Sequence, residues 1–195
     1  GDFDPGPGVF NISTGSWFSK VYCKIKSNGT FGFAGHLREI NDACFDKSGN
    51  VYLAGKFNVA TDFDPSAATY NLTPNYVDGF ISKLDSLGNF QWVKHLKTYA
   101  TAPGTLTPIN SVGYIQTDST GAIYIYGEYL DSTDFDPGPG VHKIHSPNYI
   151  TTAYNNFLLK LDSLGNFNWV VGTMESNFVY AEYSDLRTDK SGNFY

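Results

Sequence analysis

Residues 84–93, Leu84-Asp85-Ser86-Leu87-Gly88-Asn89-Phe90-Gln91-Trp92-Val93, decide the fold of this chain because they recur. Residues 161–170 repeat them almost letter for letter as Leu-Asp-Ser-Leu-Gly-Asn-Phe-Asn-Trp-Val. Residues 25–34 carry a diverged copy, Ile-Lys-Ser-Asn-Gly-Thr-Phe-Gly-Phe-Ala. In each copy an apolar strand end runs into a polar turn with glycine and then into an aromatic strand start. Glycine and asparagine supply the positive φ that such turns need, so each copy predicts a β-hairpin.

The composition favours strands and excludes some partners. Aromatic residues make up 16% of the 195 residues, which suits strands better than helices, and 20 glycines supply turns. The formal net charge of −6 provides no basic surface, so we expect no nucleic-acid partner. No apolar run reaches the roughly 18 residues of a membrane helix, so we expect no membrane insertion.

Two further motifs recur with the hairpin, and together they predict a repeat protein. Asp-Phe-Asp-Pro occurs at residues 2–5, 62–65 and 134–137, and Asp-x-x-Gly-x-x-Tyr occurs at 46–52, 118–124 and 189–195. The period is about 60–77 residues. We therefore divide the chain into three units of approximately 1–61, 62–133 and 134–195.

The middle unit predicts four main strands. Alternating apolar residues place them at 78–85, 90–96, 109–117 and 122–130, with a short extended piece at 70–73, and no segment has a helical period. Four antiparallel strands in a unit of fixed period are typical of a β-propeller blade. A ring normally has roughly four to eight blades, so we expect an all-β fragment of about three repeats from a larger ring, cut out of phase with the blades. An open stack of units is the alternative.

These motifs, taken together, resemble those of a family of bacterial extracellular β-propeller repeats. The resemblance rests on Asp-Phe-Asp-Pro-Gly-Pro-Gly-Val-Phe-Asn, Phe-x-x-Lys-Leu-Asp-x-x-Gly-Asn-Phe-x-Trp and Asp-x-x-Gly-Asn-x-Tyr, and covers nearly the whole chain. It implies a secreted or cell-surface protein of the Bacteroidota, a group whose members are often exported by type IX secretion. The pattern at Asp85, Gly88 and Trp92 is also similar to the Asp-box hairpin of sialidases, a structural device remote from catalysis.

The Asp-Phe-Asp-Pro motif is the candidate metal site. Strand side chains alternate, so each copy places two carboxylates on one side of the chain, and paired carboxylates suit Ca²⁺. The competing interpretation is that the aspartates cap turns or meet Lys24, Lys83 and Lys160, which occupy one equivalent strand position. The aspartates concerned are Asp2, Asp4, Asp62, Asp64, Asp134 and Asp136.

Other side chains give weaker signals. Four serines follow aspartate in the short pattern that secreted Bacteroidota proteins use for O-glycosylation; they are Ser86, Ser119, Ser132 and Ser163. Cys23 and Cys44 fit no metal pattern; we expect a buried free thiol at Cys23, with a disulfide as the alternative. Aromatic residues in variable loops could bind glycans or pack at blade rims; they are Trp17, Tyr76, Tyr99, Tyr149 and Tyr154. Trp92 and Trp169 are expected in the blade core.

No catalytic constellation is apparent. An active site needs one asymmetric set of groups, whereas these acids recur once per unit, so we predict no enzyme activity and no catalytic residues. The expected function is an adhesion, ligand-presenting or structural scaffold, with glycans, surface or secretion proteins and further repeats of the same longer chain as partners. The alternatives are a sialidase-like or lyase-like enzyme and a passenger of an export or motility assembly.

Overall fold

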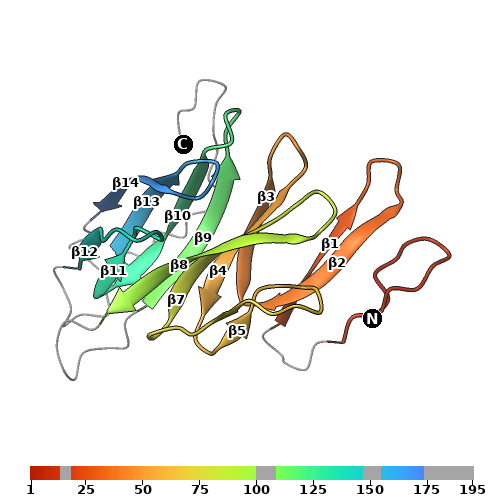
Figure 1. The fold of residues 1–195 in the computed structure, drawn as a ribbon, viewed down its shortest axis with the longest axis horizontal. Coiled ribbons are helices and arrows are strands. Elements are labelled where there is room, and N and C mark those ends of the chain that lie inside the picture. The colour runs from red at the N-terminus through yellow and green to blue at the C-terminus, as the bar shows by residue number, and fades with distance from the viewer. Residues whose placement is uncertain (14–18, 100–108, 147–154, 174–195) are drawn as a thin grey trace.

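The computed structural model describes residues 1–13, 19–99, 109–146 and 155–173, and all the elements among them are β-strands (Figure 1). The strands are β1 (Ser19–Ile25), β2 (Phe31–Arg38), β3 (Ile40–Phe45), β4 (Val51–Phe57), β5 (Thr61–Asp62), β6 (Asn71–Leu72), β7 (Asp78–Leu84), β8 (Phe90–Tyr99), β9 (Ile109–Thr117), β10 (Ile123–Leu130), β11 (Ser132–Asp134), β12 (Lys143–His145), β13 (Asn155–Leu161) and β14 (Phe167–Thr173). The all-β prediction is confirmed. Among the described residues there is no helix of the length and apolarity that a membrane span requires.

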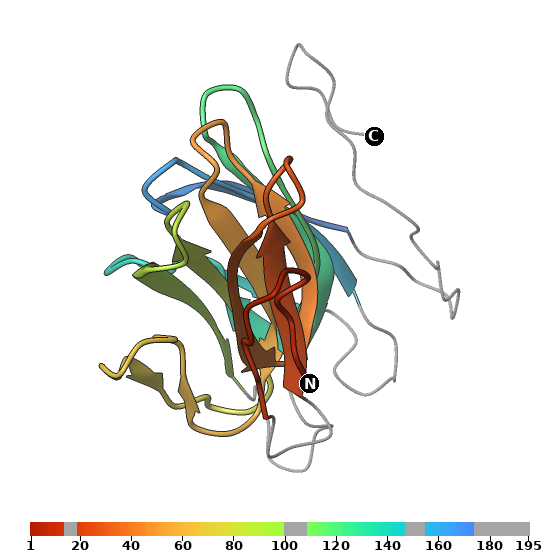
Figure 2. The same ribbon diagram turned by 90° about the vertical axis from the view of Figure 1, so that its right-hand side faces the viewer.

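All strand pairs are antiparallel, and they form three successive layers. The β1–β2 pair comes first, then a six-stranded sheet in the order β12-β11-β8-β7-β4-β3, then a four-stranded sheet in the order β14-β13-β10-β9. Figure 2, viewed from the β1–β2 end, shows these layers one behind another. The described residues do not close a ring.

Two apolar layers fill the spaces between the sheets. One lies between β1–β2 and the six-stranded sheet, where Leu37 and Leu53 pack with the aromatic trio Phe57, Phe63 and Phe80. The other lies between the two large sheets; Tyr52, Ile81, Leu96, Ile115 and Phe157 belong to it, each essentially inaccessible to solvent. Each large sheet thus has apolar side chains on a face that only another sheet covers.

Five hairpin turns share one geometry. Each has a glycine in the left-handed region; these are Gly29, Gly49, Gly88, Gly121 and Gly165, with φ between 75° and 91°. In the turn at 85–89, the Asp85 carboxylate accepts the N–H groups of Leu87 and Asn89 at 2.8 and 2.9 Å. The turns that begin at Asp46, Asp118 and Asp162 repeat this pair of bonds. The hairpin predicted from residues 84–93 is therefore confirmed, and so are its copies.

The turn glycines also contact the preceding sheet. A Cβ added to Gly88 would lie 2.6 Å from Cγ of Phe33 in β2, which is too close for any carbon pair. At the next interface, a Cβ on Gly165 would collide with Cε of Lys94 and would lie 3.2 Å from Cη2 of Trp92, both in β8. Each position requires glycine for two reasons: its φ is positive, and a side chain of the preceding sheet, the Phe33 ring or the Lys94 stem, fills the space that a Cβ would take.

We expect Gly88→Ala to lower the free energy of unfolding by about 1–3 kcal/mol, because alanine is strained at this φ and its Cβ displaces Phe33. Chemical denaturation measures the change. Gly113→Ala is the matched control: Gly113 has no positive φ, its nearest contact would be 3.6 Å away, and a change within about 0.5 kcal/mol is expected. Equal losses in the two variants would contradict this account.

Candidate functional site

The three Asp-Phe-Asp-Pro copies form the same loop. The first aspartate accepts two main-chain N–H groups with its Oδ1, one from two residues later and one from eight residues later. The donors are Asp4 and Phe10 for Asp2, Asp64 and Tyr70 for Asp62, and Asp136 and His142 for Asp134, at 2.8–3.2 Å. The first carboxylate therefore holds the loop closed in every copy.

The second aspartate folds back over its own loop. Its Oδ1 accepts the N–H two residues later; the donors are Gly6, Ser66 and Gly138, at 2.7–2.9 Å. In the third copy the carboxylate of Asp136 lies so close to Gly140 that a Cβ there would collide with it. The middle copy has Ala68 at this position, and Ser66 Oγ accepts the Ala68 N–H at 3.1 Å. These bonds use one oxygen of each candidate metal ligand.

The prediction that Lys24, Lys83 and Lys160 meet the Asp-Phe-Asp-Pro aspartates is wrong. Lys83 Nζ lies 3.9 Å from the carboxylate of Asp46, in a hairpin turn, and Lys24 Nζ donates to the carbonyls of Gly49 and Ser86 at 3.0 and 2.9 Å. Lys160 lies over the ring of Tyr124, 4.7 Å from its centroid. The three lysines sit beside the turns of the Asp-x-x-Gly motif because the strand that carries them ends there. No group of three or more metal-ligating side chains occurs in the described ranges.

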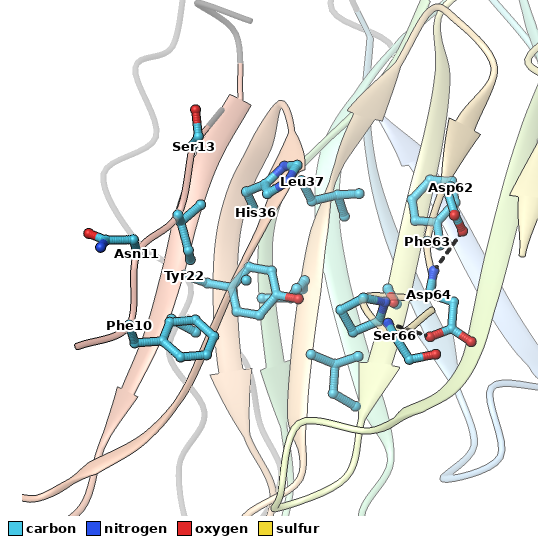
Figure 3. Close-up of a pocket in the computed structure, with 17 residues that line it drawn as sticks. Phe10, Asn11, Ser13, Tyr22, His36, Leu37, Asp62, Phe63, Asp64 and Ser66 are labelled. Carbon is cyan, nitrogen blue, oxygen red and sulfur yellow. Dashed lines mark hydrogen bonds between the residues drawn. The ribbon is translucent and has the colours of Figure 1, made fainter. Parts of the chain in front are cut away.

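The loops differ in how they join the sheets. In the third copy, β11 pairs with the edge of β8, which extends that sheet to six strands. In the second copy the equivalent strand, β5, pairs only with β6. The edge of β2, which corresponds to the edge of β8, therefore has no strand paired with it among the described residues. A groove of about 440 Å³ separates the β1–β2 pair from the loop at Asp62–Ser66 (Figure 3). This groove is the candidate binding site.

The groove combines an apolar floor with polar walls. Leu53 and Leu84 form part of the floor, and His36, Asp64 and Ser66 line its mouth. Figure 3 shows the Tyr22 ring lying between β2 and the loop, with its hydroxyl directed toward Asp64 and Ser66. Burial, and then the negative charge of Asp64, raise the pKa of Tyr22 to about 12, so the phenol stays a neutral hydrogen-bond donor.

Ser82 opens the floor of the groove. Its position in β7 corresponds to Leu159 in β13, a fully buried core residue, so a hydroxymethyl group replaces an isobutyl group. Ser82 is 1% exposed and lines the groove. Within the described residues neither its hydroxyl nor that of Tyr22 has a hydrogen-bond partner. The groove thus presents the Tyr22 hydroxyl beside the Asp64 carboxylate, with the Ser82 hydroxyl enclosed beneath them.

A second polar site, which no recurring motif marks, is closed to ligands. Asp78 is fully buried at the start of β7, and its Oδ2 accepts from Asn75 N at 2.9 Å and lies 2.6 Å from His95 Nε2. Its Oδ1 accepts both the N–H and the hydroxyl of Thr98. A carboxylate has about four lone-pair sites, so none remains for a substrate. The sequence signal was the departure from the repeat, since Asn155 and Ser19 occupy the equivalent positions.

The other predicted residues are dispersed. Ser119 and Ser163 are exposed at turns, Ser86 is half-buried, and Ser132 is 1% exposed in β11, where no transferase could reach it in the folded protein. Tyr76 is exposed, Tyr99 is half-buried beneath Lys143, and Trp17, Tyr149 and Tyr154 lie outside the described residues.

Both thiols are free, but Cys44 is the buried one and Cys23 is exposed, so the expectation for Cys23 was wrong about burial. Trp92 packs against the core, whereas Trp169 is 38% exposed.

Comparison with models of known protein families and with curated protein sequences gave no match to this chain.

We expect Asp78→Asn to lower the free energy of unfolding by about 2–4 kcal/mol, because it removes the buried charge and replaces one of the two oxygens that accept four hydrogen bonds with an NH2 donor. Burial raises the pKa of Asp78, but the bonds from His95, Thr98 and Asn75 outweigh it and hold the pKa below 3.8. The contribution is therefore complete above pH 3.8 and is lost as pH falls through the lower folded-state pKa.

Urea denaturation across this acid range tests the assignment. The wild-type chain should lose stability more steeply than Asp78→Asn as pH falls below 3.8. Glu128→Gln, which changes an exposed carboxylate on β10, serves as the control and should follow the wild type. Parallel curves for the wild type and Asp78→Asn would refute the role given to Asp78.

Proposed function

We propose that this chain is a non-catalytic module of a secreted or cell-surface β-propeller, with a scaffold or ligand-presenting role. One observation carries the proposal. All six Asp-Phe-Asp-Pro carboxylates are engaged by the main chain of their own loops, in one pattern repeated three times. Groups used in this way hold a loop in shape, and each copy repeats a structural part.

The propeller itself is supported by the meanders of the two large sheets. Strands β3, β4, β7 and β8 are neighbours in chain order, and so are β9, β10, β13 and β14. The same turn-on-ring contact joins successive layers twice, at Gly88 on Phe33 and at Gly165 on Trp92. A repeated geometry of this kind, continued by further units, is compatible with a ring or with an open stack.

An enzyme of the sialidase or lyase type is the less favoured function. Such chemistry needs unrepeated acids open to a substrate, and the unrepeated carboxylate of Asp78 is buried with every acceptor site used. The sequence has two arginines, Arg38 and Arg187, which is few for binding acidic sugars. Export by type IX secretion, a Bacteroidota host and a passenger role in an export or motility assembly rest on the sequence resemblance.

We propose the groove between β1–β2 and the Asp62–Ser66 loop as the ligand site of this module. Its carboxylate and the unengaged Tyr22 hydroxyl can bind a hydroxyl pair of a sugar, and the leucine floor suits the C–H face of a pyranose ring. The volume of about 440 Å³ is in the range of small-molecule pockets. The ligand class is therefore a neutral glycan.

Glycan-array binding followed by titration calorimetry tests this proposal. We expect Tyr22→Phe and Asp64→Asn each to weaken binding about tenfold or more, because the first removes a hydroxyl and the second replaces a charged acceptor with a neutral amide. Asp136→Asn is the matched control: it makes the same change in the third loop, which does not line the groove, and should bind like the wild type. Equal loss in Asp64→Asn and Asp136→Asn, or no bound glycan at all, would count against the groove.

Calcium provides a separate test of the loops. Because one oxygen of each aspartate already accepts main-chain N–H groups, we expect added Ca²⁺ to give no binding heat and no rise in Tm. Asp134→Asn should nevertheless lower the Tm, since the amide weakens the bonds from Asp136 and His142. Stoichiometric Ca²⁺ binding that is lost in Asp134→Asn would instead support a metal site in these loops.

A further inference from the structure

The loop that lines the groove departs from the other two copies at three consecutive positions. Residues 6–8 and 138–140 read Gly-Pro-Gly, whereas residues 66–68 read Ser-Ala-Ala. The main-chain bonds to the two aspartates are nevertheless the same in all three loops. The replacement therefore acts on the side chains of a loop that keeps its hydrogen-bonded frame.

Glycine at the last of these positions makes room for the second aspartate of the motif. A Cβ added to Gly140 would collide with Oδ2 of Asp136. In the first loop, a Cβ added to Gly8 would collide in the same way with Oδ2 of Asp4. Neither glycine is in the left-handed region, so the backbone does not require it. The carboxylate requires it, because one of its oxygens lies against the glycine.

Ala68 denies this place to the carboxylate of Asp64. Its methyl group occupies the space that the other two loops give to Oδ2 of the second aspartate. Oδ1 of Asp64 still accepts the Ser66 N–H at 2.9 Å, so the carboxylate remains attached by one oxygen while the other is kept off the loop. Asp64 lines the groove, and after burial its charge is the second cause of the raised pKa of Tyr22.

We propose that Ala68 is a positioning residue of the groove: its methyl group prevents the Asp64 carboxylate from folding onto its own loop and leaves Oδ2 to accept a hydrogen bond from a ligand. The inference rests on the proposed function and explains why one of three equivalent aspartates serves it. Asp4 and Asp136, whose loops keep glycine, do not line the groove. A carboxylate accepts but cannot donate, so the sugar must present a hydroxyl or amine hydrogen there, and an acidic sugar is repelled.

A crystal structure of the Ala68→Gly variant tests the positioning without any ligand. We expect the Asp64 carboxylate to fold onto residue 68, as that of Asp136 does onto Gly140, while the main-chain bonds of the loop persist. The reverse change, Gly140→Ala, serves as the control: it should push the Asp136 carboxylate off its loop and leave Asp64 in place. An Asp64 carboxylate that keeps its wild-type position in Ala68→Gly would overturn the proposal.

Titration calorimetry with the neutral glycan that binds best on the array tests the consequence for binding. We expect Ala68→Gly to weaken binding about fivefold or more in the wild-type background and to have no effect in the Asp64→Asn background, because it acts through that carboxylate. Equal losses in both backgrounds would overturn the proposal. If no glycan binds although the carboxylate moves as expected in the crystal, the glycan function is rejected and the positioning role is supported.

Discussion

The approach of a turn glycine to an aromatic ring on the preceding layer fixes how the sheets of this protein stack. Gly88 approaches Phe33 so closely that any side chain would displace the ring, and its φ of 91° excludes most other residues. The turn is therefore both the end of a hairpin and a spacer between sheets. The apolar layers around Phe80 and Phe157 lie between the same pairs of sheets, so the turn contacts and the side-chain packing must agree on one separation.

Aspartate side chains supply hydrogen-bond acceptors for the main-chain N–H groups of their own turns. A tight turn leaves main-chain N–H groups without partners, and in a repeat protein the cost recurs in every unit. Asp85 supplies the acceptor for two of these groups, and Asp62 does the same for the longer loop between β4 and β7. The acidic character of the chain follows largely from this use, which explains why acidic residues are frequent here without forming an acidic site.

The hairpins and strands could be predicted because their causes are local. Glycine, asparagine and alternation over a few residues determine them, and β7, β9 and β10 lie within a residue of the predicted ranges. The predictions for the partner of Lys83 and for the burial of Cys23 were wrong, because both properties depend on which layer lies opposite each strand. The position of Ser132 in a paired strand depends on the edge of β8, where Ser132 pairs with Tyr99, 33 residues earlier in the chain, and no local pattern encodes that pairing.

The candidate site follows from differences between equivalent positions rather than from any motif. Where one interface has Ile81 and Leu159, the other has Tyr22 and Ser82, and both changes put a hydroxyl where the repeat has a hydrocarbon. Gly35, at the position of Lys94, leaves room for the Tyr22 ring, because a Cβ there would collide with it. These changes are far apart in sequence, yet they meet on one side of β7 and β2. A repeat that departs from its own pattern at several positions around one cavity has lost packing there, and the ligand that we propose for this groove would recover part of it.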